Sequence, residues 1–373
     1  MIPLFKPSFR VEECLKEIER CLSVGWSGQG FLTEEFEQEW KIYTKEPNAI
    51  FVNSASAALH LALASLRTVF NWTDTSEVIS TPLTFVTTNH SIYWSNLKPV
   101  LVDVGRDLCL NPEEIEKAIT NNTKAVIFVA VGGNTSNLKA IRELCDEYHL
   151  QLIIDAAHAS GAKLEGKDIG FYGDATCYSF QAVKNLPTAD SGMLCLKNSA
   201  AHNLAKKLSW CGISTSTFER SQKSAYKWEY EVDEIGYKEN GTSVMAALVL
   251  VGLKYLDSDN IFRRELFQKY LKAFGSRTNI ELISHSNENE SSRHLIQIIV
   301  NNRDAVIDHL SNNGIGTGVH YRTNTHYPMY SNFASSTPTS TSLSNKIVTL
   351  PNFLEITDSE IEYIVSKVAE AVE

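Results

Sequence analysis

The chain has 373 residues, of which 43% are hydrophobic and 21% are charged, and its formal net charge is −10. This composition is typical of a globular protein and excludes a largely disordered chain. No segment concentrates lysine and arginine, so the electrostatic attraction that binds phosphate backbones is missing and no nucleic-acid partner is expected.

The N-terminus and the longest apolar run argue against export and membrane insertion. The first residues, MIPLFKPSFR, lack the basic segment and following apolar stretch of a signal peptide. The apolar run 244–253 is too short to span a bilayer. The seven cysteines form no CxxC pair, so neither a metal site nor a disulfide framework is expected. We therefore expect a cytoplasmic protein with no membrane partner.

From about residue 12 to residue 200, short β-rich runs alternate with helical ones. The expected strands and helices, in chain order, are strand 49–53, helix 57–66, strands 77–81, 99–104 and 125–131, helix 137–148, and strands 150–155, 175–179 and 192–196. Continuous apolar strands that alternate with amphipathic helices indicate a mostly parallel sheet covered on both faces. In such sheets, ligands bind at the carboxyl ends of the strands.

The pattern changes near residue 244. The expected elements there are one long helix over 243–272, a strand over 294–300, and helices that begin at Asp304 and Asp358. The stretch SSTPTSTS at 335–342 is expected to be a mobile surface loop. We predict an α/β chain with a large domain over 1–243 and a small α+β domain over 244–373, against which the N-terminal residues pack.

Four chemically useful groups follow the predicted strands of the large domain. Asp155 closes one strand, Ser179 closes the next, Lys184 follows five positions later, and a helix begins near Ser56 after the strand AIFVN. Pyridoxal 5′-phosphate (PLP) needs this set: a carboxylate for its pyridine nitrogen, a lysine for its aldehyde, and a helix start with hydroxyls for its phosphate. Each signal alone has a plainer interpretation, since a strand-end Asp commonly forms a turn, a loop Lys is commonly solvated, and a Ser before a helix is commonly a cap.

Two longer strings carry a family resemblance. IIDAAHASGA (153–162) and SFQAVKNLPTADSG (179–192) resemble the DegT/DnrJ/EryC1/StrS family of PLP-dependent sugar aminotransferases, and the similarity runs nearly end to end. The resemblance implies the PLP-dependent transferase fold of type I, as in aspartate aminotransferase, with PLP as cofactor.

The resemblance also implies roles for the residues that hold the cofactor ring. Lys184 matches the Schiff-base lysine, and Asp155 matches the acid that pairs with the pyridine nitrogen. His158 matches the residue near the ring hydroxyl, although it is also consistent with a buried structural histidine. Phe85 matches the aromatic that stacks on the ring, although core packing is the plainer interpretation.

Further matches concern the phosphate and the substrate. Ala55 and Ser56 match a Gly-Thr pair that binds phosphate together with Ser179. Lys238 matches a residue that reaches the phosphate of the neighbouring subunit, which implies a homodimer with shared active sites, or else it is a surface charge. The remaining matches lie near the substrate, although Tyr321 is equally consistent with packing; they are Trp26, His320 and Tyr321.

The chain departs from the family pattern at four positions. Relatives have Gly-Glu/Asp-Gly-Gly after the lysine, where this chain has Ala189, Asp190, Ser191 and a glycine. Glu239 and Asn240 stand where relatives have an aromatic residue and an arginine. Glu239 places a negative charge beside a segment expected to approach phosphate.

The expected reaction moves an amino group from an amino acid, in the first place glutamate, to a nucleotide-linked keto-deoxy sugar in amino-sugar or surface-polysaccharide biosynthesis. Lys184 would move the proton and Asp155 would keep the ring cationic. One alternative is an aminotransferase for another small ketone or 2-oxo acid, although the sequence offers no clear arginine clamp for a second carboxylate. The other alternative, motivated by the departures, is a PLP-binding regulatory protein without turnover.

Overall fold

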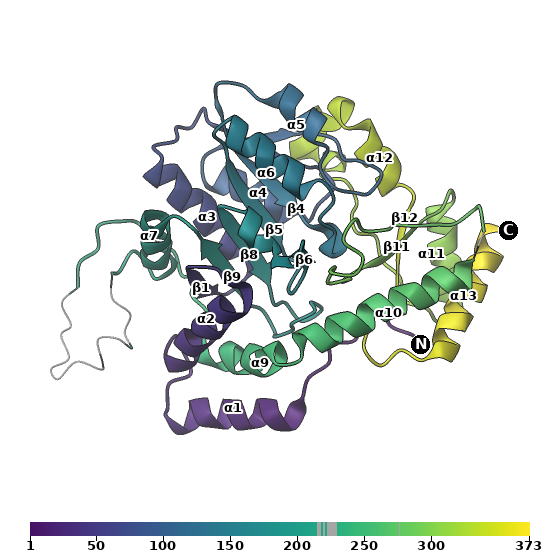
Figure 1. The fold of residues 1–373 in the computed structure, drawn as a ribbon, viewed down its shortest axis with the longest axis horizontal. Helices are drawn as coiled ribbons and strands as arrows, with labels where there is room; N and C mark the ends of the chain where they lie inside the picture. The colour runs from purple at the N-terminus through teal and green to yellow at the C-terminus, as the bar shows by residue number, and fades with distance from the viewer. Residues whose placement is uncertain (215–217, 219–220, 222–229, 276) are drawn as a thin grey trace.

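The computed structural model describes residues 1–214, 218, 221, 230–275 and 277–373. A central seven-stranded sheet lies between two layers of helices, and a smaller group of strands and helices lies beside it (Figure 1). The long helix α10 (Leu256–Phe274) runs from beneath the large sheet along the smaller group (Figure 1).

The large sheet has the strand order β1-β9-β8-β5-β4-β2-β3, and only β9 runs antiparallel to its neighbours. The bounds of its strands are β1 Ala49–Val52, β2 Glu77–Ser80, β3 Lys98–Leu101, β4 Thr123–Val129, β5 Gln151–Ala156, β8 Ala175–Ser179 and β9 Gly192–Leu196. Because almost every residue of these strands is buried, both faces of the sheet are covered, as the continuous apolar runs predicted.

Successive residues of each strand point to opposite faces of the sheet. Ile153 packs against one helical layer and Ile154 against the other. The helices on the first face are α3 (Ala55–Val69), α4 (Val86–Trp94) and α7 (Ser199–Ser209). The helices on the second face are α2 (Phe31–Thr44), α5 (Pro112–Ala118), α6 (Leu138–Glu147) and α9 (Ser243–Leu253), with α1 (Val11–Ser23) packed outside α9. A short hairpin of β6 (Lys163–Leu164) and β7 (Lys167–Asp168) follows β5.

The C-terminal elements surround an antiparallel sheet of order β10-β11-β12. Their bounds are β10 Glu281–Leu282, β11 Ile296–Ile299, α11 Arg303–Asn312, β12 Ile347–Leu350 and α13 Asp358–Val372. The chain start joins this group, since the Ile2 amide donates to the Gly314 carbonyl over 2.8 Å and the Gly316 amide donates to the Ile2 carbonyl over 2.8 Å. The predicted packing of the N-terminal residues there is therefore observed, while the domain division at 243/244 stays a prediction.

The expected single helix over 243–272 is wrong, because the chain forms two helices, α9 and α10. The break is a tight turn in which the Lys254 amide donates to Val251 and the Tyr255 amide donates to Gly252. Residues of α9 pack into the core beneath the large sheet, whereas Leu266 and Phe267 of α10 pack into the C-terminal core. The interruption thus falls between the segment that packs beneath the large sheet and the segment that reaches the C-terminal core.

The expected mobile loop at 335–342 is also wrong. Residues Pro328–Ser336 form a 3₁₀ helix and Pro338–Ser344 form α12. Asp103, just past β3, accepts hydrogen bonds from the Thr339 amide at 2.7 Å, the Ser340 amide at 2.7 Å and the Ser340 hydroxyl at 2.5 Å. The carboxylate thus caps the start of α12. Because Asp103 is distant in the sequence, the composition of the Ser/Thr-rich stretch does not reveal this contact.

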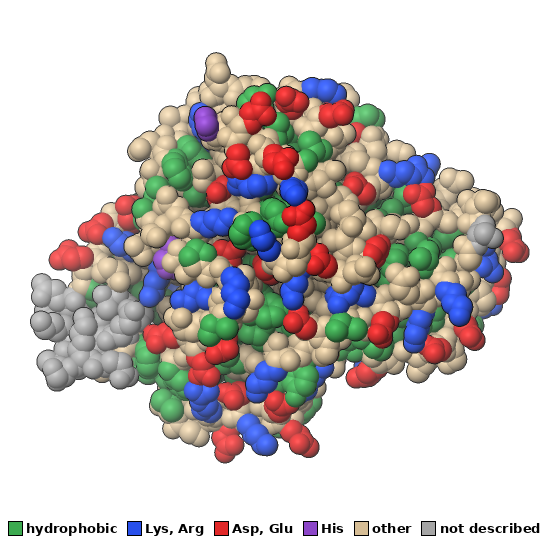
Figure 2. All heavy atoms as spheres, viewed as in Figure 1, with side chains coloured by type: hydrophobic (Ala, Val, Ile, Leu, Met, Phe, Trp, Pro, Cys, Tyr) green, Lys and Arg blue, Asp and Glu red, His purple; other side chains and the backbone are tan. Residues whose placement is uncertain are grey.

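The fold class predicted from sequence is confirmed: the chain is α/β, with a mostly parallel central sheet covered by helices. In the parts of the chain that the structure describes, no helix is long and apolar enough to cross a membrane. On the face shown in Figure 2, acidic and basic side chains are interspersed rather than gathered by sign.

Candidate active site

A cavity of about 440 Å³ lies at the carboxyl ends of β5 and β8. The first turns of α3 and α4 and the segment 320–321 complete its wall. Eight residues singled out from the sequence line it: Ala55, Ser56, Phe85, Asp155, Ser179, Lys184, His320 and Tyr321. The topology thus brings most of the predicted site together, because parallel strands end at the same edge of the sheet.

Asp155 lies near the end of β5 and is 5% exposed. Its Oδ2 accepts a hydrogen bond from the Thr88 hydroxyl at 2.7 Å, and its Oδ1 accepts one from the Ala157 amide at 3.1 Å. Burial raises the pKa of Asp155, although these hydrogen bonds and the charge of Lys184 act to lower it. Thr88, in the first turn of α4, was not singled out from the sequence; its position three residues after Phe85 was the only available signal.

Lys184 follows β8 in a turn that begins at Ser179. The Ser179 hydroxyl accepts from the Gln181 amide at 3.4 Å, and the Lys184 amide donates to the Gln181 carbonyl at 2.8 Å. Burial lowers the pKa of Lys184 to about 8, while the nearby Asp155 carboxylate raises it. A lysine with this pKa is partly neutral near pH 7 to 8, which is the form that attacks an aldehyde.

The first turn of α3 provides a place for an anion. Ser54 caps this helix by accepting from the Ala57 amide at 3.1 Å, so the amides of Ala55 and Ser56 begin the helix next to the cavity. Gly192 lies against this turn, because a Cβ there would stand 2.7 Å from the Ser54 carbonyl carbon and 2.8 Å from the Ala55 nitrogen. No side chain fits at position 192 without moving the helix start.

His158 lies behind the cavity wall rather than in it and is 5% exposed. Its Nδ1 accepts from the Gly132 amide at 3.3 Å, and its Nε2 lies 2.8 Å from the Tyr321 hydroxyl. Burial lowers the pKa of His158 well below its usual value, so the ring is neutral and its one proton is on Nε2. Nε2–H therefore donates to Tyr321, which leaves the Tyr321 proton for an acceptor in the cavity.

Phe85 forms the open side of the cavity and is 56% exposed. Its ring centroid lies 6.3 Å from that of Tyr321, which stacks on His158 with an angle of 16° between the planes. A large aromatic with this exposure beside a cavity is unusual for a core residue and offers a face to a planar ligand.

Comparison with known proteins identifies the chain's relatives. The model of the DegT/DnrJ/EryC1/StrS aminotransferase family matches residues 9–369. Uncharacterized protein MJ1066 of Methanocaldococcus jannaschii is 33% identical, over 100% of this chain and 97% of that protein. The chain belongs to the DegT/DnrJ/EryC1/StrS aminotransferase family. It is accordingly a PLP-dependent enzyme of the sugar aminotransferase class.

Solved structures of aminotransferases are similar to this chain over nearly its whole length. The putative sugar aminotransferase Spr1654 from Streptococcus pneumoniae, in its PMP form, is 27% identical, with a TM-score of 0.92 over 100% of this chain and 99% of that one. PseC from Helicobacter pylori, an aminotransferase involved in the biosynthesis of pseudoaminic acid, is 23% identical, with a TM-score of 0.90 over 100% and 99% of the chains, and shows the same fold.

The cavity fits PLP, the cofactor of this family. Its groups have the chemistry that the cofactor needs: the helix start at Ala55 and Ser56 suits the phosphate, Asp155 suits the ring nitrogen, and Lys184 suits the aldehyde carbon.

Besides His158, two predicted residues do not line the cavity of this chain. Lys238 places its ammonium 3.1 Å from the centroid of the Trp210 ring, and burial lowers its pKa. The Trp26 indole nitrogen donates to the Gln29 carbonyl at 2.5 Å, and its ring centroid lies 5.3 Å from that of Phe218. Their proposed roles toward a second subunit and the substrate stay predictions.

Two residues that depart from the family pattern form hydrogen bonds with neighbouring side chains. The buried Ser191 hydroxyl pairs with the Thr188 hydroxyl at 2.8 Å, and Thr188 donates to the Phe180 carbonyl at 2.6 Å. Glu239 turns to α3, where its Oε1 lies 2.9 Å from His60 Nδ1. Glu239 thus bonds to His60 and does not line the cavity.

Proposed function

We propose that this enzyme transfers an amino group from glutamate to the keto group of a nucleotide-linked keto-deoxy sugar, in amino-sugar and surface-polysaccharide biosynthesis in the cytoplasm. The observation that carries the proposal is the composition of the cavity wall. Of the described residues that line it, Lys184 alone carries a positive charge, and the open side is aromatic. This wall suits a large polyol, which can stack on the aromatic ring and hydrogen-bond to the hydroxyl groups.

Each residue has a defined task in the proposed reaction. When bound, PLP supplies the electron sink that stabilises a carbanion at the substrate carbon. Lys184 holds the cofactor and, once released, moves the proton between the substrate carbon and the cofactor carbon. Asp155 keeps a proton on the ring nitrogen, which its buried carboxylate does best when ionised. Phe85 orients the ring and shields its face from water.

We also propose that two subunits share each active site. The phosphate end of the cavity combines backbone amides and hydroxyls with Asp190 and has no cation of its own among the described lining residues. A phosphate dianion favours a positive partner, and Lys238 of the partner subunit would supply it. Trp26, His320 and Tyr321 are proposed to border the sugar.

The test is a screen of nucleotide keto-sugars with glutamate as donor, with products identified by mass spectrometry. We expect an amino-sugar product from wild type and none from Lys184→Ala. 2-Oxo acids serve as competing acceptors in the same assay. Conversion of 2-oxo acids alone would overturn the sugar assignment, and bound PLP that glutamate never converts to its amine form would overturn turnover altogether.

A further inference from the structure

Three buried polar side chains form a cluster directly behind Lys184. Asn185, Asn260 and His294 are 5%, 1% and 3% exposed, and they come from the loop after β8, from α10 and from the segment before β11. We call them the Asn185 cluster. Nothing in the proposed chemistry uses these groups, yet burying three polar side chains is unfavourable unless each is hydrogen-bonded.

Asn185 uses all of its side-chain hydrogen-bonding groups. Its Nδ2 donates to the Ser292 carbonyl at 2.7 Å and to Asn260 Oδ1 at 2.8 Å. Its Oδ1 lies 2.9 Å from His294 Nδ1. Because the Ser292 carbonyl only accepts, the orientation of the amide is fixed, and Oδ1 must receive a proton from His294. The residue next to Lys184 is therefore held from three directions.

Asn260 joins this loop to the one that follows Asp155. While its Oδ1 accepts from Asn185, its Nδ2 donates to the Ser160 carbonyl at 3.0 Å. The approach requires Gly161, which has φ +76° and whose added Cβ would stand 2.7 Å from Asn260 Nδ2. One side chain of α10 thus fixes the spacing between two strand-end loops.

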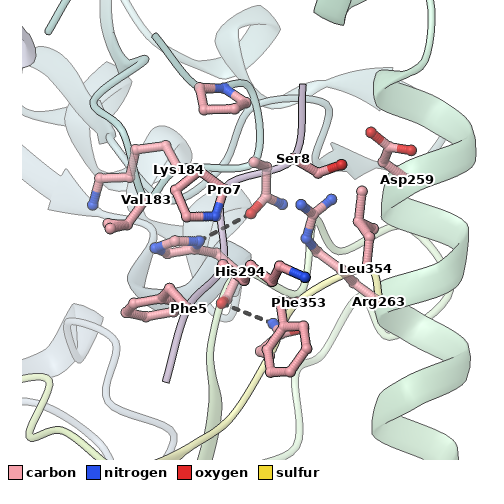
Figure 3. Close-up of a pocket in the computed structure, with 14 residues that line it drawn as sticks. Phe5, Pro7, Ser8, Val183, Lys184, Asp259, Arg263, His294, Phe353 and Leu354 are labelled. Carbon is pink, nitrogen blue, oxygen red and sulfur yellow. Dashed lines mark hydrogen bonds between the residues drawn. The ribbon is translucent and has the colours of Figure 1, made fainter. Parts of the chain in front are cut away.

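His294 connects the cluster to the cavity wall. Its ring stacks on Phe5 at 5.3 Å and lies 4.6 Å from the ring of His158. Burial, together with the positive charge of Lys184, lowers the pKa of His294 well below its usual value, so the ring is neutral and its proton is on Nδ1. In Figure 3, His294 lies beside Phe5, and the Lys184 side chain leaves this group on the side away from Arg263.

We propose that Asn185, Asn260 and His294 are positioning residues that fix the backbone of Lys184 relative to the loop of Asp155 and His158. This inference rests on the proposed role of Lys184. None of the three residues lines the proposed cofactor cavity. It acts by preventing the two loops from shifting, and shifts of about 1 Å at a reacting group are enough to slow a reaction about 100-fold.

The test compares His294→Leu with His294→Asn. The asparagine amide nitrogen takes the place of Nδ1 and still donates to Asn185, whereas leucine leaves Asn185 Oδ1 buried without a donor. The first measurement is the rate at which cofactor-free protein captures PLP on Lys184, followed by absorbance from pH 6 to pH 10 and confirmed by borohydride reduction and peptide mass spectrometry. The second is kcat and KM for glutamate.

We expect His294→Leu to slow PLP capture and to lower kcat by about 10- to 100-fold, with KM within about two-fold. His294→Asn should restore most of both rates. Should His294→Leu fail to fold, Asn260→Ser removes the link between the two loops without adding an apolar group, and the same loss is expected. Tyr270→Phe is the control, since it deletes a buried hydrogen bond, 3.1 Å to the Pro351 carbonyl, in the C-terminal core.

The outcomes separate this inference from the proposed function. If the wild-type protein does not capture PLP on Lys184, both the positioning role and the proposed function are wrong. If wild type captures PLP but His294→Leu and Asn260→Ser are no slower than Tyr270→Phe at a matched loss of thermal stability, the positioning role alone is wrong. If His294→Asn is as slow as His294→Leu, the hydrogen bond to Asn185 is not the cause and the inference also fails.

Discussion

The floor and the rim of the cavity are built differently. On the floor, Asp155 is buried and accepts two hydrogen bonds, and His158 is held between the Gly132 amide and Tyr321. On the rim, Phe85 is more than half exposed, and Lys238 lies on Trp210 outside this chain's own cavity. The floor groups are thus held by contacts within one chain, whereas Phe85 at the rim is exposed and Lys238 lies beyond the rim on the surface.

This difference distinguishes the groups proposed to carry out the reaction from the groups proposed to select the substrate. The groups proposed to act on the cofactor are fixed by the ends of buried strands, and errors in their position are opposed by the packing of the sheet. The groups proposed to meet the sugar, Trp26, His320 and Tyr321, lie outside the strands of the sheet and are only partly buried. Substitutions on the floor should therefore affect the rate, and substitutions on the rim should affect affinity.

The largest expected effect is that of Lys184→Ala. Turnover should fall by at least about 10³-fold, because covalent attachment of the cofactor and proton transfer are both lost. PLP should then be washed out of the protein by dialysis, and borohydride should label no peptide of the variant. Lys184→Arg keeps the charge and should be equally inactive; substantial activity in either variant would contradict the assignment of the floor.

The next effect is that of Asp155→Asn, which should lower kcat about 10²- to 10³-fold, because the ring nitrogen loses its ionised partner. It should also change the pH dependence of PLP capture. The neutral Lys184 amine reacts, so in wild type the rate should rise with pH and level off above the Lys184 pKa of about 8. Since Asp155 raises that pKa, the variant's rise should occur at lower pH.

Asp168→Asn is the matched control for the Asp155 substitution. Asp168 is also a buried carboxylate with a raised pKa, about 6, but it accepts from Tyr178 and Gly170 and does not line the cavity. It should cost stability and leave the pH profile of capture unchanged. An Asp155→Asn profile that is unshifted, or shifted to higher pH, would show that the two groups do not interact as described.

A smaller effect is expected at the rim from Lys238→Ala. PLP affinity should fall about ten-fold, which corresponds to about 1.4 kcal/mol for one exposed charge–phosphate contact, with kcat at saturating PLP within about two-fold. Lys207→Ala, which removes the nearby partner of Asp233, is the control and should not change affinity.

Mixing the variants tests whether the site is shared between subunits. A hybrid dimer of Lys184→Ala and Lys238→Ala subunits has both defects in one site and an intact second site. Equilibrium PLP titration of the hybrid should therefore reveal half the sites with wild-type affinity. Absence of the high-affinity half would mean that Lys238 acts within its own chain, whereas an unchanged affinity in the Lys238→Ala homodimer would mean that it does not act at all.

The smallest effect is expected from Ser191→Gly, which restores the residue usual in the family. Activity should change by less than about two-fold, because the Ser191 hydroxyl faces Thr188. The free energy of unfolding should fall by about 0.5–1.5 kcal/mol through loss of that hydrogen bond, as measured by denaturant titration. A marked gain in activity would instead mean that the departure limits the enzyme.

The sequence was most informative where local pattern and tertiary structure agree. The strand 175–179 and the strand 192–196 were predicted at their observed bounds, because buried strands are apolar throughout and end at turn residues. It was least informative where contacts between residues far apart in the sequence decide the local structure. The Ser/Thr-rich stretch after residue 335 became a helix because Asp103 caps it, and the helix from residue 243 broke because two separate cores bind its halves.

The sequence by itself determined the seven strands of the large sheet, and, through its resemblance to a family, the candidate lysine, acid and phosphate-binding turn. Only the tertiary structure decided how these groups are supported. It placed Thr88 on Asp155, turned Glu239 away to His60, and joined the loops of Lys184 and Asp155 through Asn260. Hydrogen bonds between residues far apart in sequence leave no periodic signal, so the residues that hold the site in place became visible only once the chain was folded.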